Sequence, residues 1–141
     1  MIIETIISTI NTKGDVNFAP FGIKKRKNFV FISPYIPSKT LENLKKSGTA
    51  VINYIDDAKY FVDCLTGNKR FKKLESVKFK GFFLADSLYH EEVKVVSVKN
   101  HKIRPTFKCE IVGEFIHKKY SGHNRARSAI LEACILASRL S

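Results

Sequence analysis

Three adjacent polar residues, Ser38, Lys39 and Thr40, open the segment PSKTLENLKKSG and have the chemistry to bind a phosphate. The segment carries leucines at helical spacing and stops at Gly48, which predicts a short helix. In the first turn of a helix, unpaired backbone N–H groups and the positive end of the helix dipole attract anions. Hydroxyl and ammonium groups at that place add further donors. The alternative is that Ser38 or Thr40 is the helix N-cap and binds nothing else.

The other residue types that support catalysis show no comparable pattern. Glu91 and Glu92 are adjacent, so on a strand they face opposite sides and cannot act as a carboxylate pair. No GxSxG segment and no metal-binding spacing of cysteine or histidine is present. We therefore identify no catalytic side chain and no metal site, and we interpret the cysteines as reduced core thiols: Cys64, Cys109 and Cys134.

The chain is strongly basic, with 25 Lys+Arg against 13 Asp+Glu and a net charge of +12. This balance favours an anionic ligand, a nucleic acid or an acidic surface without choosing among them. No stretch approaches the roughly 20 apolar residues of a membrane span. Because Glu4 interrupts the apolar N-terminal segment, we interpret that segment as a strand of a cytoplasmic protein rather than a leader.

The elements that position these residues are mostly strands. A length of 141 residues, 44% of them hydrophobic, fits one domain covering residues 1–141. Residues 38–48, 56–67 and 124–140 have helical spacing, the second with an Asp cap, while residues 68–78 remain undetermined. The expected strands are 2–11, 16–23, 28–36, 49–55, 80–100 and 103–119. About six antiparallel strands of this kind curl into a small barrel.

The order of these segments resembles a known family. VNFAPFGI, NFVFISPYI, PSKTLENLKKSG and TAVINYI follow one another as in the flavin-reductase-like branch of the FMN-binding split barrels. The flanking segments ETIISTINTKGDVNFAPFGI and NRARSAILEACILASRL are similar to an uncharacterised flavoprotein family of methanogenic archaea and methylotrophic bacteria. The resemblance implies a homodimeric, six-stranded antiparallel split β-barrel with a C-terminal helix, which holds FMN noncovalently near the subunit interface. The apolar terminal helix, too wide for one packing face, independently favours a dimer.

The resemblance also implies which residues bind the cofactor. The phosphate is expected on Ser38, Lys39 and Thr40, supported by Asn43 one turn along the helix. The flavin ring is expected along the strand that contains Asn17, Ala19, Pro20, Phe21 and Gly22. For two further residues the role stays open. Asn53 is either a ligand contact or a strand-end turn residue. Arg125, like Arg127, either contacts the ligand or the other subunit or is a solvated residue.

The function that follows from this resemblance is that of an FMN-binding protein, expected to be an oxidoreductase of unknown substrate. The flavin supplies the reactive group in such proteins, so the chain need not contribute a nucleophile. Two alternatives remain from the sequence: a basic barrel that binds nucleic acid, and a flavin-fold scaffold that has lost its flavin.

Overall fold

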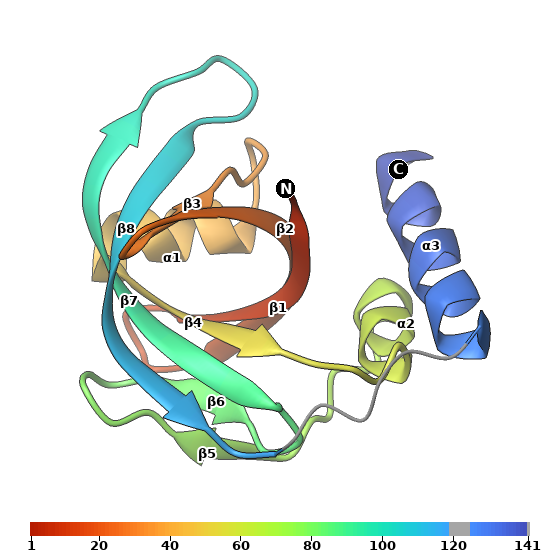
Figure 1. Cartoon of the computed structure of the whole chain (residues 1–141). Helices are drawn as coiled ribbons and strands as arrows, with labels where there is room; N and C mark the ends of the chain where they lie inside the picture. Colours follow the sequence, from red (N-terminus) through yellow and green to blue (C-terminus); the bar gives the residue numbers. More distant parts are fainter. Residues whose placement is uncertain (119–124, 141) are drawn as a thin grey trace.

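Six antiparallel strands form a closed barrel (Figure 1), which confirms the fold expected from the sequence. The order around the barrel is β1-β2-β3-β8-β7-β4. This computed structural model describes residues 1–118 and 125–140, with the backbone alone for 125–129 and 138–140. The barrel strands are β1 Ile3–Ile10, β2 Val16–Arg26, β3 Phe29–Ile32, β4 Thr49–Tyr54, β7 Tyr89–Lys99 and β8 Thr106–Ile116.

The barrel begins with a hairpin whose turn chemistry is visible in the sequence. β1 and β2 pair from Ile3 opposite Ile23 to Ile10 opposite Val16. Between them, the Asn11 side chain accepts the backbone N–H groups of the turn, and Gly14 adopts a φ of +86°. Only glycine takes that backbone angle without steric cost, so the turn and the register are set locally.

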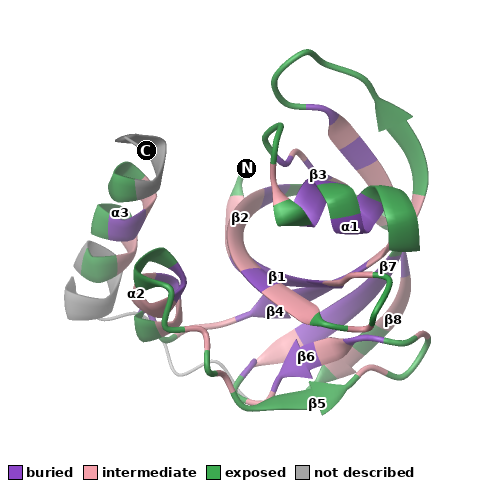
Figure 2. Cartoon of the chain, turned by 180° about the vertical axis from the view of Figure 1, so that it is seen from behind, coloured by how far each residue is buried: buried purple, intermediate pink, exposed green. Residues whose placement is uncertain are grey.

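One hydrophobic cluster fills the barrel and takes residues from all six strands. Helix α1 (Lys39–Ser47) adds Leu41 and Leu44 to it, and Figure 2 shows both buried and exposed residues along α1. Ser38 is the N-cap, because its hydroxyl accepts the Leu41 N–H at 3.2 Å. The strand members of the cluster include Ile7, Ile23, Val30, Ile32, Ile52, Val93, Phe107 and Cys109.

A second cluster lies outside the barrel. Ile6 belongs to it, whereas the next residue Ile7 belongs to the first, because successive side chains of a strand face opposite sides. This cluster joins the barrel to helices α2 (Lys59–Thr66) and α3 (Arg125–Leu140), which lie side by side in Figure 1. Helix α3, expected from the sequence, leaves Ile130 and Leu136 exposed.

One local expectation from the sequence was wrong in detail, and the structure defines a stretch that the sequence left undetermined. The strand expected over 80–100 is broken into β6 (Phe82–Leu84) and β7, because Ser87 turns back to bond the Leu84 carbonyl. The undetermined stretch contains β5 (Lys73–Glu75), which pairs with β6 as a separate two-stranded sheet. Helix α2 begins after Ala58, which has no side-chain cap bond, but Asp57 Oδ1 accepts the Lys59 N–H at 3.0 Å, so an Asp does cap the start of this helix as expected.

The two adjacent glutamates of β7 face opposite sides, as predicted. Glu91 accepts from Lys25 Nζ at 2.6 Å, while Glu92 accepts the Val77 N–H at 2.9 Å and contacts His90. Both carboxylates are buried, and each has its own partners. The three cysteines are free and buried, also as expected. In the part of the chain that the structure describes, no helix is long and apolar enough to cross a bilayer.

Candidate functional site

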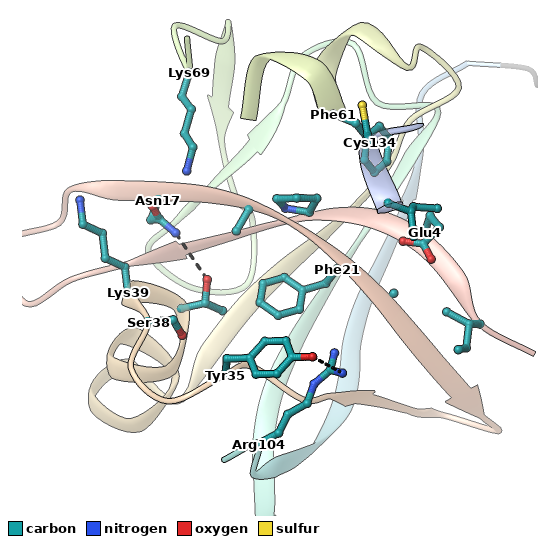
Figure 3. A pocket seen from close by; sticks show the side chains of 16 residues that line it. Glu4, Asn17, Phe21, Tyr35, Ser38, Lys39, Phe61, Lys69, Arg104 and Cys134 are labelled. Atoms are coloured by element: carbon teal, nitrogen blue, oxygen red, sulfur yellow. Dashed lines mark hydrogen bonds between the residues drawn. The ribbon is translucent and has the colours of Figure 1, made fainter. Parts of the chain in front are cut away.

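A cavity of about 740 Å³ lies beside β2, between the start of α1 and helix α3 (Figure 3). We call it the main cavity. Its walls come from seven separate parts of the chain, which the fold brings together. The lining residues are Ile2, Glu4, Asn17, Ala19, Pro20, Phe21, Gly22, Tyr35, Ser38, Lys39, Thr40, Phe61, Lys69, Arg104, Cys134 and Ile135.

One end of the main cavity is formed by the start of α1. The first helical hydrogen bond runs from Glu42 N to the Ser38 carbonyl, so the N–H groups of Lys39 and Thr40 have no acceptor among the described residues. Thr40 is buried, and its hydroxyl lies 3.4 Å from the Asn17 amide nitrogen, which donates to it. These groups form a cluster of hydrogen-bond donors suited to an anion.

Two lysines add positive charge at the same end. Lys39 belongs to α1 and Lys69 follows α2, and Figure 3 shows both side chains extending toward Asn17. A phosphate carries close to two negative charges at neutral pH, so two ammonium groups beside free N–H groups match it in charge.

The long wall of the main cavity is the first half of β2. Strand β3 pairs with β2 only over 24–26, so residues 17–22 have a strand partner, β1, on one edge alone. The other edge borders the cavity and leaves backbone groups available to a ligand. Gly22 carries no side chain, and an added Cβ would lie 2.6 Å from Ile2 Cγ2, so a larger residue here requires Ile2 to move. The bare backbone at Gly22 leaves this part of the strand open to a flat ligand.

The residues expected from the sequence divide into three groups. Those of β2 and of the α1 start line the main cavity together. Asn43 and Asn53 do not: both are buried and hold the scaffold, Asn43 through Thr9 Oγ1 at 3.0 Å and Asn53 through the Ile6 carbonyl at 2.9 Å. A buried amide with satisfied partners is not available to a ligand. The side chain of Arg125 lies outside the described residues.

Sequence reasoning missed several cavity residues, among them Tyr35, Lys69 and Arg104. The basic run 68–73 looks like any solvated loop, and nothing local distinguishes Lys69 within it. Arg104 reaches the cavity from the turn between β7 and β8, where its Cζ lies 4.4 Å from the Tyr35 ring centroid. Tyr35 was expected inside the strand over 28–36, but β3 ends at Ile32 and leaves Tyr35 exposed in the segment before α1.

The cavity wall contains one thiol, that of Cys134. Burial raises its pKa above the ordinary range, so the thiol stays protonated at neutral pH. A protonated thiol is a poor nucleophile. The described side chains of the main cavity thus favour binding and orientation over covalent catalysis.

Comparison with solved structures places the fold in the class of split barrels, several of which are described as FMN-bound or as flavin reductases. An FMN-bound protein from Methanosarcina mazei superposes with a TM-score of 0.79 at 24% identity, over 98% of this chain and 74% of that one. Flavoredoxin from Methanosarcina acetivorans superposes with a TM-score of 0.70 at 14% identity, over 89% of this chain and 76% of that one. The 2-nitrobenzoate 2-nitroreductase NbaA from Pseudomonas fluorescens superposes with a TM-score of 0.72 at 20% identity, over 81% of this chain and 64% of that one.

The particular family follows from the sequence itself. Residues 3–118 match the model described as "Protein of unknown function (DUF447) N-terminal domain", and the chain belongs to that family. The Methanosarcina mazei protein is also described as DUF447. No curated protein matches the chain.

Proposed function

We propose that this chain binds FMN in the main cavity and acts as a flavin-dependent oxidoreductase. One observation carries the proposal: two separate sets of residues converge on a single cavity. Ser38, Lys39 and Thr40 were assigned to a phosphate, the strand 17–22 to the flavin ring, and both line the main cavity. The FMN bound by the DUF447 neighbour supports the same cofactor.

The proposed binding mode uses the two ends of the cavity differently. The phosphate accepts the free N–H groups of Lys39 and Thr40, with Lys39 and Lys69 supplying positive charge. The isoalloxazine ring lies along the open edge of β2, against Pro20 and Phe21. Placed so, the cofactor is held by backbone donors at one end and by an apolar wall along its length.

When bound, FMN supplies hydride and electron transfer. The chain contributes orientation and exclusion of water: Phe21 and Phe61 give apolar walls, and the protonated Cys134 thiol stays unreactive. No described residue of the cavity is required as a nucleophile or general base for this role.

The test is a titration of flavin-free protein with FMN and with riboflavin, followed by quenching of flavin fluorescence. Because the phosphate is proposed to meet several donors and two ammonium groups, FMN should bind at least about tenfold more tightly than riboflavin. Equal affinities would remove the phosphate assignment while keeping the flavin. Binding of neither would remove the proposal and leave the nucleic-acid and scaffold alternatives, which a labelled-RNA titration separates.

A further inference from the structure

A second hollow of about 510 Å³ adjoins the main cavity, and the two share Ile2, Gly22 and Arg104. Resting on the proposed function, we propose that the second hollow binds the substrate, a small anion with an apolar body, and that Arg104 binds its anionic group. The remaining lining residues of the second hollow are Lys24, Phe31, Ser33, His101 and Thr106.

The guanidinium of Arg104 is held in one orientation. Its Nε donates to the Ser33 carbonyl at 2.6 Å, its Nη1 donates to the Tyr35 hydroxyl at 3.3 Å, and the group stacks on the Tyr35 ring. A guanidinium has five N–H donors, so these two bonds leave others for a ligand. Among the described residues, no carboxylate forms an ion pair with Arg104. A stacked, unpaired guanidinium suits bidentate binding of a carboxylate.

The backbone around Arg104 is fixed as well. His101 Nδ1 accepts the N–H groups of Ile103 at 3.1 Å and of Arg104 at 3.0 Å. The Ile103 carbonyl accepts the Ile36 N–H at 2.9 Å, which ties this turn to the segment that carries Tyr35. Arg104 therefore meets a ligand from a preorganised position, and little entropy is lost on binding.

The distribution of charge separates Arg104 from the phosphate end. Lys39 and Lys69 extend toward Asn17, whereas Arg104 lies with Tyr35 on another side of the cavity (Figure 3). The phosphate is already matched by the two lysines, so Arg104 is a surplus positive charge. Lys24 adds a second positive charge to the second hollow, whereas Glu4 lines the main cavity and not the second hollow.

The rest of the second hollow gives the expected shape of the ligand. Ile2 and Phe31 form apolar walls, and the Ser33 and Thr106 hydroxyls, 2.8 Å apart, already bond each other. The hollow thus offers positive charge at one place and apolar contact elsewhere, which favours an aromatic or aliphatic acid over a sugar or a neutral polyol.

The probes that test this are benzoate and its neutral counterpart benzamide, titrated into FMN-loaded protein and followed by ligand-observed NMR. Benzoate should bind at least about tenfold more tightly than benzamide, because only the charged benzoate carboxylate forms an ion-paired hydrogen bond with the Arg104 guanidinium. Arg104→Gln should lower benzoate affinity by a similar factor and change benzamide affinity much less. Lys102→Gln is the matched control, because Lys102 is exposed on the same turn and lines neither hollow.

Several outcomes would overturn the inference. Equal affinity for the two probes would do so without any variant, as would wild-type benzoate binding by Arg104→Gln or an equal loss in Lys102→Gln. Loss of FMN in Arg104→Gln would assign Arg104 to the flavin instead. If wild-type protein binds no FMN, the proposed function fails, but the same probe titrations on flavin-free protein still decide whether Arg104 binds an anion. Thermal melting checks folding, and Arg104→Lys should regain part of the affinity.

Discussion

Nδ1 of His90 lies 2.7 Å from Nε2 of His117, so a buried imidazole is hydrogen-bonded to an exposed one. The other nitrogen of His90 lies 2.7 Å from Glu92 Oε2. Both oxygens of that carboxylate accept backbone N–H groups, from Val77 and Lys78. His90 then donates through Nε2, and its Nδ1 accepts the His117 Nε2–H. The result is a chain of three groups in which both rings are neutral.

We predict that the hydrogen-bonded groups of Glu92, His90 and His117 make the barrel less stable in acid. Burial lowers the pKa of His90 against the opposing effect of Glu92, and burial with the Lys118 charge lowers the pKa of His117. The unfolded chain then binds more protons, so stability is full above the ordinary histidine pKa of about 6.5 and is lost as pH falls below it. NMR titration should show both histidines titrating below 6.5. A value above 6.5 for either would contradict the neutral pair.

Lys69, which lies outside α1, is predicted to bind the FMN phosphate with Lys39. Lys69→Ala should weaken FMN about tenfold, leave riboflavin unchanged and alter the unfolding free energy by less than about 0.5 kcal/mol. Lys72→Ala in the same basic run is the control, since Lys72 is exposed and does not line the cavity. A similar loss of FMN affinity in both variants would indicate general electrostatic attraction instead.

Two glycines should separate cofactor binding from stability. Gly22→Ala drives a methyl group to 2.6 Å from Ile2 Cγ2, and the exposed Ile2 side chain can move, so the variant should fold while losing several-fold in FMN affinity. Gly48→Ala places a side chain at a φ of +70° at the C-cap of α1 and should cost about 1 kcal/mol. Its FMN affinity should not change. Urea unfolding and FMN titration of both variants check the contrast.

Asn53 is predicted to stabilise the fold rather than contact the cofactor. Its amide donates to the Ile6 carbonyl and to Ser8 Oγ at 2.7 Å, and its oxygen accepts the Leu84 N–H at 2.8 Å. Asn53→Ala leaves buried groups unpaired and should cost about 3 kcal/mol in urea unfolding, with FMN affinity of the folded fraction unchanged. A stable variant that binds FMN poorly would restore the ligand-contact role.

The protein is predicted to be a homodimer whose assembly is linked to FMN. Helix α3 lines the main cavity through Cys134 and Ile135 and still exposes Ile130 and Leu136. A second subunit would cover this apolar surface and complete the cavity wall. Sedimentation velocity at low micromolar concentration should give twice the chain mass, and FMN should raise the melting temperature. A monomer that binds one FMN would contradict the shared cavity.

Local patterns in the sequence determined the barrel strands, helix α1 and the polar cluster at its start. Alternation places Glu91 and Glu92 on opposite sides of a strand, and Gly48 ends a helix by its own backbone freedom, so neighbouring residues suffice to predict both. The pairing order of the barrel is not local. Resemblance to known proteins implied a six-stranded antiparallel barrel, which the structure confirms, and the structure alone gives the order of the strands around it.

Only the tertiary structure decided which side chains reach the cavity. Asn17 and Thr40 are 23 residues apart and meet because β2 passes the start of α1. Arg104 and Ser33 are 71 residues apart. The turn between β7 and β8, which carries Arg104, has no sequence pattern that indicates a ligand. The sequence left open whether Asn53, expected near a strand end, contacts a ligand. In the structure Asn53 is buried and bonds to Ile6 of β1 and Leu84 of β6. Contacts between distant segments depend on how the barrel closes, and single-residue chemistry carries no information about that closure.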